Sequence, residues 1–218
     1  MKKRLLIALS LLVLLSTYKP QKLFSIIKFN IKKINLENNL ILKDEEIKKD
    51  LFFLYDTSII FLNTSKIEEI LKKKSIIQSF SIKKKYPNEL KIIIFENKPI
   101  FVIINDNNKF YLSENINFID YLDLKAFRDL PIVFGDKENF KILFKSMKKI
   151  DFPINLVKNY YLFESNRWNL ETYKKKIIKL PSENYVKSLK NFMNLRKENK
   201  FDKYEVFDYR INNQLILK

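Results

Sequence analysis

Two alternating hydrophobic segments joined by a turn are the feature that most constrains the fold. In residues 77–84 and again in residues 90–95, side chains of like character recur at every second position. A period of two is typical of a β-strand that buries one face. Between the segments, Pro87 fixes its own φ and Asn88 tolerates a left-handed conformation. The pattern predicts a β-hairpin.

One strand and two helices are predicted before this hairpin. Residues 29–36 favour a first strand, and Asp44 is placed to cap a helix whose apolar positions continue to Tyr55. Ser65 and Glu68 have the spacing of a capping box at the start of a second helix. The predicted order is therefore strand, helix, helix, strand, strand, which is typical of a small α+β unit.

A second domain is expected from residue 98 to residue 218, mostly antiparallel β with at least two helices. One helix is predicted after Asp136 and another after Pro181-Ser182, because apolar side chains follow each at helical spacing. The expected strands are residues 131–134, 157–164, 167–172, 175–180, 204–210 and 214–218.

The composition argues against most enzyme mechanisms. The chain has no histidine, no cysteine and one glycine, so it lacks the residues of a His or Cys zinc site, a Ser-His-Asp triad, a Walker loop and a dinucleotide fingerprint. A carboxylate pair or a Ser-Lys dyad stays open, although a chain rich in these residues brings some together by chance. We expect no enzymatic activity, metal, cofactor or small-molecule substrate.

The net charge of +17 raises the alternative of a nucleic-acid binder. The charge is dispersed, however: without the first 20 residues, 38 basic and 25 acidic side chains remain. Abundant Lys, Asn, Ile, Phe and Tyr with scarce Gly and Ala are typical of an AT-rich genome. We therefore expect no nucleic-acid partner, with anionic lipid or wall polymer as a secondary possibility for the lysine runs at 72–74 and 83–85.

The N-terminus carries a basic tail followed by an uncharged segment. Residues 1–4 contain three basic side chains, and residues 5–18 contain no charge. Fourteen helical residues reach only about 21 Å, against a hydrocarbon core of about 30 Å, so a signal peptide and a retained anchor both fit. No small-x-small cleavage pattern follows. We expect a cytoplasmic tail (1–4) and a transmembrane signal anchor (5–18), with the bulk of the chain outside the cytoplasm.

The first unit resembles a known family in its residues as well as its element order. The residues that carry the likeness are Leu-Glu-Asn-Asn at 36–39, TSKIEEIL at 64–71, IKKKYPNELKIIIFENKP at 82–99 and Leu-Pro-x-x-x-Gly at 130–135. They resemble the POTRA domain and the following β domain of the bacterial cell-division proteins FtsQ and DivIB. The resemblance implies a POTRA domain at 28–97 and an FtsQ-type β domain at 98–218.

The resemblance also implies a function. The family is a divisome scaffold of the inner membrane, single-pass and located at the septum, whose C-terminal strand region receives a segment of FtsB, itself paired with FtsL. The residues expected at this partner-binding edge are Tyr204, Val206, Asp208, Tyr209, Arg210, Ile211, Asn213, Leu215 and Leu217.

A second expected docking edge lies in the POTRA domain, because exposed sheet edges accept strands from other chains. Its residues are Phe80, Ile82, Lys84, Tyr86 and Pro87. An accessory role in protein secretion or outer-membrane assembly is the alternative function, although repeated POTRA units and a barrel pattern are not evident in the sequence.

Overall fold

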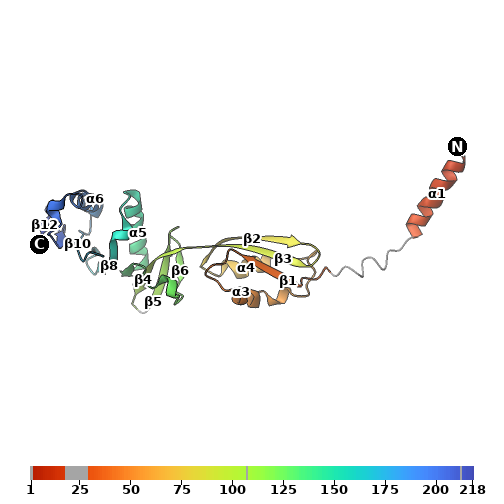
Figure 1. Ribbon diagram of the computed structural model, residues 1–218, viewed down its shortest axis with the longest axis horizontal. Coiled ribbons are helices and arrows are strands. Elements are labelled where there is room, and N and C mark those ends of the chain that lie inside the picture. Colours follow the sequence, from red (N-terminus) through yellow and green to blue (C-terminus); the bar gives the residue numbers. More distant parts are fainter. Residues whose placement is uncertain (1, 18–28, 107, 212) are drawn as a thin grey trace. The chain divides into compact units, whose positions relative to one another are not determined.

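A computed structural model describes residues 2–17, 29–106, 108–211 and 213–218 (Figure 1). The chain divides into two compact units, Met1–Glu96 and Asn97–Lys218. The N-terminal segment forms one helix, α1 (Lys2–Thr17). Among the described residues, no helix has both the length and the apolar character needed to cross a membrane. The predicted transmembrane anchor is therefore not confirmed and stays a prediction.

After α1, the described part of the first unit contains a three-stranded sheet and two short helices. Its elements are β1 (Lys33–Glu37), α3 (Asp44–Asp50), the 3-10 turn η1 (Phe52–Leu54), α4 (Ser65–Lys72), β2 (Ile77–Lys85) and β3 (Glu89–Glu96). The strand order is β1-β3-β2, with β1 parallel and β2 antiparallel to the central β3. The predicted hairpin and element order are confirmed. The helices supply the crossover that parallel strands β1 and β3 require.

Hydrophobic side chains on one face of β3 form the centre of this unit. Leu90, Ile92 and Ile94 are fully buried, as are Ile47 of α3 and Ile67 of α4. On β2, Phe80, Ile82 and Lys84 lie opposite the buried residues of β3 in the register. The alternation in the sequence thus marks the face of the sheet that meets the helices.

Three local predictions for the first unit were wrong. The first strand begins at Lys33, because residues 29–31 instead pair with residues 57–59. The helix from Asp44 ends at Asp50, and η1 follows it. Ser65 is the first helical residue rather than the cap, and the preceding Thr64 donates its hydroxyl to the Glu68 carboxylate at 2.9 Å.

The second unit is built on a sheet of nine strands. They are β4 (Pro99–Asn105), β5 (Asn108–Ser113), β6 (Phe118–Asp120), β7 (Ile132–Phe134), β8 (Val157–Phe163), β9 (Arg167–Thr172), β10 (Ile177–Lys179), β11 (Val206–Asp208) and β12 (Ile216–Leu217). The order is β12-β11-β10-β9-β8-β7-β4-β5-β6. Helices α5 (Lys137–Lys149) and α6 (Tyr185–Leu195) are joined to it, with 3-10 turns at Lys125–Phe127, Ile154–Leu156 and Asn199–Phe201.

The expected antiparallel meander is only part of this sheet. Strands β8, β9 and β10 follow one another as predicted, but β4 with β7, β7 with β8, and β10 with β11 are parallel pairs. In two of these, a helix crosses over: α5 lies between β7 and β8 in the chain, and α6 between β10 and β11. A helical crossover allows the chain to return to the same edge of a sheet, which is why those neighbours are parallel.

The only glycine in the chain stands where another residue would not fit. Gly135 has φ of +148°, and a Cβ built there would lie 2.5 Å from the Cβ of Leu162. The next residue, Asp136, caps α5 as predicted, because its carboxylate accepts a hydrogen bond from the Asn139 backbone at 2.8 Å. Gly135 therefore permits the sharp change of direction from β7 into α5.

Aromatic rings fill the space between α5 and the sheet. The ring of Phe101 packs edge-on against Phe140, Phe144 and Tyr160, with centroid distances of 5.0, 5.1 and 5.6 Å. Tyr160 is fully buried, and its hydroxyl has no hydrogen-bond partner among the described residues. Burial raises the pKa of Tyr160, so its hydroxyl stays protonated. The free-energy cost of removing this hydroxyl from water is not offset by a hydrogen bond among the described residues.

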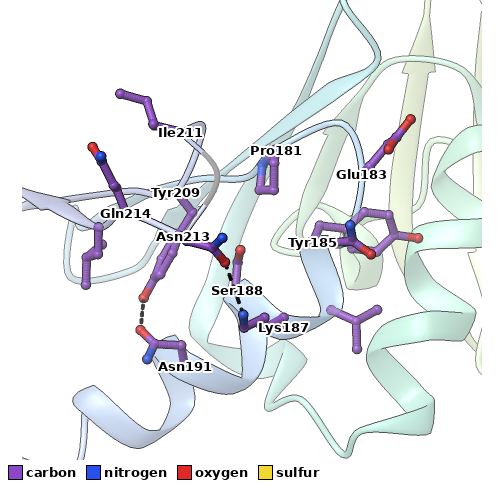
Figure 2. A pocket seen from close by; sticks show the side chains of 13 residues that line it. Pro181, Glu183, Tyr185, Lys187, Ser188, Asn191, Tyr209, Ile211, Asn213 and Gln214 are labelled. Carbon is purple, nitrogen blue, oxygen red and sulfur yellow. Dashed lines mark hydrogen bonds between the residues drawn. The ribbon is translucent and has the colours of Figure 1, made fainter.

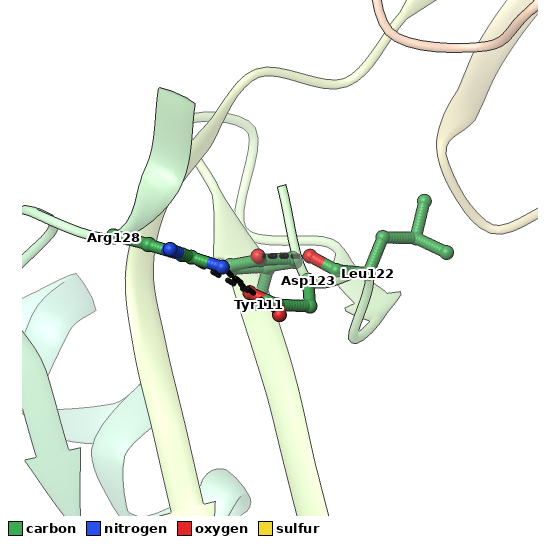
Figure 3. Close-up of polar contacts among 4 residues, drawn as sticks. All are labelled: Tyr111, Leu122, Asp123 and Arg128. Atoms are coloured by element: carbon green, nitrogen blue, oxygen red, sulfur yellow. Dashed lines mark hydrogen bonds and ion pairs between the residues drawn. The ribbon is translucent and has the colours of Figure 1, made fainter. Parts of the chain in front are cut away.

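We expect Tyr160→Phe to stabilise the protein by about 1 kcal/mol, because the substitution removes an unsatisfied buried hydroxyl while the ring keeps its contacts. Urea unfolding of the full chain measures the difference. Tyr111→Phe is the matched control: the Tyr111 hydroxyl donates to the carbonyl of Leu122 (Figure 3), so its loss should destabilise. A destabilised Tyr160→Phe variant would show that the hydroxyl has a partner after all.

Candidate partner-binding edge

Strand β12 ends the sheet of the second unit. Within the described part of the chain it pairs only with β11, where Phe207 lies opposite Leu217 and Asp208 opposite Ile216. Just beyond the strand, Val206 and Lys218 exchange both backbone hydrogen bonds, at 3.0 and 3.1 Å. The second side of β12 has no neighbouring strand, so this is a sheet edge.

The hydrogen-bonding phase of β12 identifies which backbone groups point away from the sheet. In an antiparallel ladder, bonded and non-bonded pairs alternate. Because Lys218 bonds to Val206, the N–H and C=O of Leu217 point outward, where an added strand could pair with them. The side chains of Leu215 and Leu217 pack against the hydrophobic core, whereas Ile216 is partly exposed.

The edge was predicted over two strands, residues 204–210 and 214–218, and only the second of them lies at the edge of the sheet. The strand within residues 204–210 is β11, three residues long, and it lies between β10 and β12. Its neighbour β10 runs parallel to it because α6 returns the chain to that side of the sheet. The edge is therefore formed by residues 216–217, and β11 is interior.

Two of the expected contact residues are buried and support the edge from within. The carboxylate of Asp208 accepts hydrogen bonds from Arg210, with Nε at 2.8 Å and Nη2 at 2.6 Å. This charge-assisted pairing lowers the pKa of Asp208 and raises that of Arg210. Tyr209 is buried, which raises its pKa, and its hydroxyl donates to the Asn191 side chain of α6 at 2.9 Å (Figure 2). These contacts hold both side chains within the unit, and Tyr209 also lines the cavity beside the edge.

A cavity of about 780 Å³ adjoins this edge, between α6 and the chain that leads into β12 (Figure 2). Tyr185, Lys187 and Asn191 line it from the helix, and Ile211 and Leu215 line it from the other side. The Nζ of Lys187 donates to the Asn213 side chain at 3.3 Å across the cavity. About half of Ile211 is exposed, so an apolar group bound in the cavity could pack against the Ile211 side chain.

The remaining expected residues lie nearby with different surroundings. Tyr204 and Val206 are half-buried, and Arg210 is exposed. Asn213 has a left-handed φ of 58°, a conformation that asparagine tolerates better than most residues. Sequence reasoning missed the contribution of α6 because polar residues that line the cavity, such as Lys187 and Asn191, indicate only solvent exposure when they are seen in a sequence.

The second predicted docking edge, in the first unit, is also a terminal strand. β2 borders only β3, so its other side has no neighbouring strand in the described chain. Phe80 and Ile82 are half-buried, and Lys84 donates to the backbone carbonyl of Leu62 at 3.0 Å. Tyr86 is exposed at the hairpin, before Pro87 and a cis peptide bond.

Comparisons with known proteins agree with this architecture. Residues 29–97 match the family described as "POTRA domain, FtsQ-type". The chain is 33% identical over 87 residues to the cell division protein DivIB of Clostridium acetobutylicum, and 37% over 93 residues to DivIB of Bacillus cereus. It is 26% identical over 194 residues to the cell division protein FtsQ of Rickettsia bellii. Residues 29–97 therefore form an FtsQ-type POTRA domain, and the chain is similar to the cell division proteins FtsQ and DivIB.

The extent of these matches differs between the two groups of relatives. The alignment with the Clostridium DivIB covers 40% of this chain and 35% of the relative, and that with the Bacillus DivIB covers 43% and 36%. The chain thus spans about a third of the length of the DivIB relatives it matches. The Rickettsia FtsQ alignment covers 87% of this chain and 72% of the relative, so it includes the second unit.

The Asp208–Arg210 pair gives a testable pH dependence. A carboxylate whose pKa is lowered by folding adds stability above its unfolded pKa of about 3.9, and this contribution is lost as the pH falls through the folded value. We expect Asp208→Asn to cost about 1–2 kcal/mol at pH 7. The difference from wild type should shrink below about pH 4.

Chemical denaturation at several pH values measures this effect. Asp123→Asn is the control, because Asp123 also pairs with an arginine, Arg128, at 3.1 Å but both side chains are exposed (Figure 3). Its substitution should change stability little at any pH, since exposed ion pairs contribute little. A pH-independent effect of Asp208→Asn would contradict the assignment.

Proposed function

We propose that this chain is a non-enzymatic cell-division protein that binds FtsB- and FtsL-like partners by adding a partner strand to β12. The observation that carries the proposal is the outward backbone of Leu217 next to an open cavity. An exposed sheet edge supplies hydrogen bonds to any extended chain, and adjacent pockets supply selectivity for its side chains. The names of the FtsQ and DivIB relatives support the division role.

The proposed mechanism is stoichiometric and makes or breaks no covalent bond. A partner segment would pair with Leu217 and place an apolar side chain against Ile211 and Leu215 in the cavity. Lys187, at the rim, would favour a carboxylate on the partner, since its positive charge lies beside the cavity and its Nζ donates to the uncharged side chain of Asn213. Docking would then link the partners to septal wall synthesis.

We further propose that α1 is retained as a single-pass anchor in the inner membrane. Lys2, Lys3 and Arg4 precede the uncharged segment, which favours a cytoplasmic N-terminus and places both units outside. A helix of 16 residues is about 24 Å long, so the adjacent lysines would extend toward the headgroups. Confinement to a membrane raises the effective concentration of membrane-bound partners.

The edge of β2 is a second proposed docking site, supported by its terminal position and by its half-buried Phe80 and Ile82. POTRA domains are expected to use such an edge for strand addition. Other membrane-bound division proteins are the proposed partners here.

Leu217→Pro tests the strand addition directly. Proline removes the outward N–H, and an edge strand tolerates it where that N–H faces solvent. Leu217→Ala is the matched control, because it shortens the same side chain but keeps the N–H. We expect Leu217→Pro to weaken binding of FtsB-like peptides at least about tenfold more than Leu217→Ala does, or about 1.4 kcal/mol.

Isothermal titration of the full chain with the peptide measures both affinities, and thermal unfolding shows whether each variant keeps its fold. Equal affinities for the two folded variants would rule out backbone pairing at Leu217.

Ile211→Glu tests the cavity. A carboxylate at this half-exposed position should repel an apolar side chain from the cavity and weaken peptide binding, while folding is retained. Ile142→Glu is the control, since Ile142 is an equally apolar, exposed residue on α5 that does not line the cavity. Both variants enter the same titration, and equal loss in the two would show a charge effect unrelated to the cavity.

A further inference from the structure

The chain enters the sheet of the first unit at one end and leaves it at the opposite end. Residues 29–31 lead into β1, and the Asn88 carbonyl, just before β3, accepts hydrogen bonds from the backbones of Lys32 and Lys33 at 2.9 and 3.3 Å. Because β1 and β3 are parallel, the chain leaves at the opposite end, at Glu96. We call the end with residues 29–33 the proximal end and the end with Glu96 the distal end (Figure 1).

Exposed aromatic and aliphatic side chains gather at the proximal end. Ile59 donates to the carbonyl of Phe29 at 2.8 Å, so the segment after it lies beside the point where the chain enters. Phe61 in that segment is 87% exposed, and Ile60 is also exposed. Tyr86, 62% exposed, lies at the tip of the hairpin, and Lys84 next to that tip reaches the carbonyls of residues 60 and 62.

The segment that carries Phe53, Ile60 and Phe61 has few charged side chains, whereas lysines flank Tyr86 in the hairpin. Residues 51–66 contain one acid, Asp56, and one base, Lys66. The Nζ of Lys66 lies 4.3 Å from the centre of the Phe53 ring, and Phe53 is itself partly exposed. Phe61 stands beside other exposed apolar side chains, and a cluster of this kind, unlike a single exposed residue, marks an interaction surface. The patch therefore combines aromatic groups with lysines at its border.

We propose that this proximal patch, Phe53, Ile60, Phe61 and Tyr86 with Lys66 and Lys84, inserts into the headgroup region of the lipid bilayer that holds α1. The inference rests on the proposed anchoring of α1. Only eleven residues separate Thr17 from Phe29, and they can span at most roughly 40 Å. Aromatic rings favour the membrane interface, and bordering lysines pair with anionic headgroups.

The distal end provides an internal control. Leu40 is even more exposed than Phe61, at 93%. Its backbone N–H, with those of Ile41 and Leu42, donates to the carboxylate of Glu96 at 2.7–2.9 Å, which fixes this loop beside the chain's exit. If exposure alone caused membrane contact, Leu40 and Phe61 would behave alike. The proposal requires that they differ.

The chain has no cysteine, so a single introduced cysteine can carry a fluorophore at one chosen site. The full chain with Phe61→Cys or Leu40→Cys is labelled with a polarity-sensitive nitrobenzoxadiazole dye. It is then reconstituted into phosphatidylcholine vesicles that contain one quarter phosphatidylglycerol. We expect emission at position 61 to shift to shorter wavelength and to be quenched by lipids with a nitroxide near the headgroup. The dye at position 40 should report water.

A second variant guards against an effect of the dye itself. With the label at Tyr86→Cys, the added substitutions Ile60→Ser and Phe61→Ser should abolish the shift, because the apolar groups that drive insertion are gone. Flotation of the vesicles shows separately whether the protein is bound to the membrane, as the proposed anchor requires. Co-flotation with equal emission at positions 61 and 40 overturns the patch but keeps the anchor. Failure to float overturns both proposals, and a shift that grows with protein concentration in the absence of lipid overturns lipid as the occupant.

Discussion

The packing of α6 against β11 positions the whole C-terminal region of the second unit. The rings of Phe192 and Phe207 meet edge-on with centroids 5.0 Å apart, and Leu189 is fully buried alongside. This contact holds the helix across the sheet, so that the chain returns beside β10 in the parallel direction. β12 then has only one place to pair, and its outer side stays free. Truncating either ring would therefore disturb the edge as well as the core.

Much of the fold could be predicted from local patterns in the sequence. The hairpin of β2 and β3 has an alternating pattern and a Pro-Asn turn, and α5 has both an aspartate cap and a buried stripe, so local physics determines them. The parallel neighbours could not be predicted in this way. Whether β7 lies beside β4 and β8 depends on contacts between residues that are far apart in sequence, such as Ile103 opposite Val133. No local period records that pairing.

The candidate site shows the same division. Strand-like residues at the end of the chain indicated an edge, yet they could not show that Asp208 and Tyr209 turn inward. Both types are polar or amphipathic and are usually assigned to the surface. They are buried because each has a partner: Arg210 folds back onto Asp208, and Asn191 on α6 receives the Tyr209 hydroxyl. A hydrophobicity pattern cannot predict hydrogen-bond partners that only the tertiary structure brings together.

The short strand β12 also limits how many hydrogen bonds the edge can offer to an added strand. The Arg210 backbone donates to the Asp208 carboxylate at 3.1 Å, so the chain leaves the ladder after β11 and β12 is only two residues long. An added strand would gain about two to four backbone hydrogen bonds, each of net worth about 0.5–1.5 kcal/mol. Association itself costs at least about 4 kcal/mol. The proposed docking would therefore require the cavity beside Ile211, and the proposed membrane anchoring would strengthen it by raising the effective concentration of the partners.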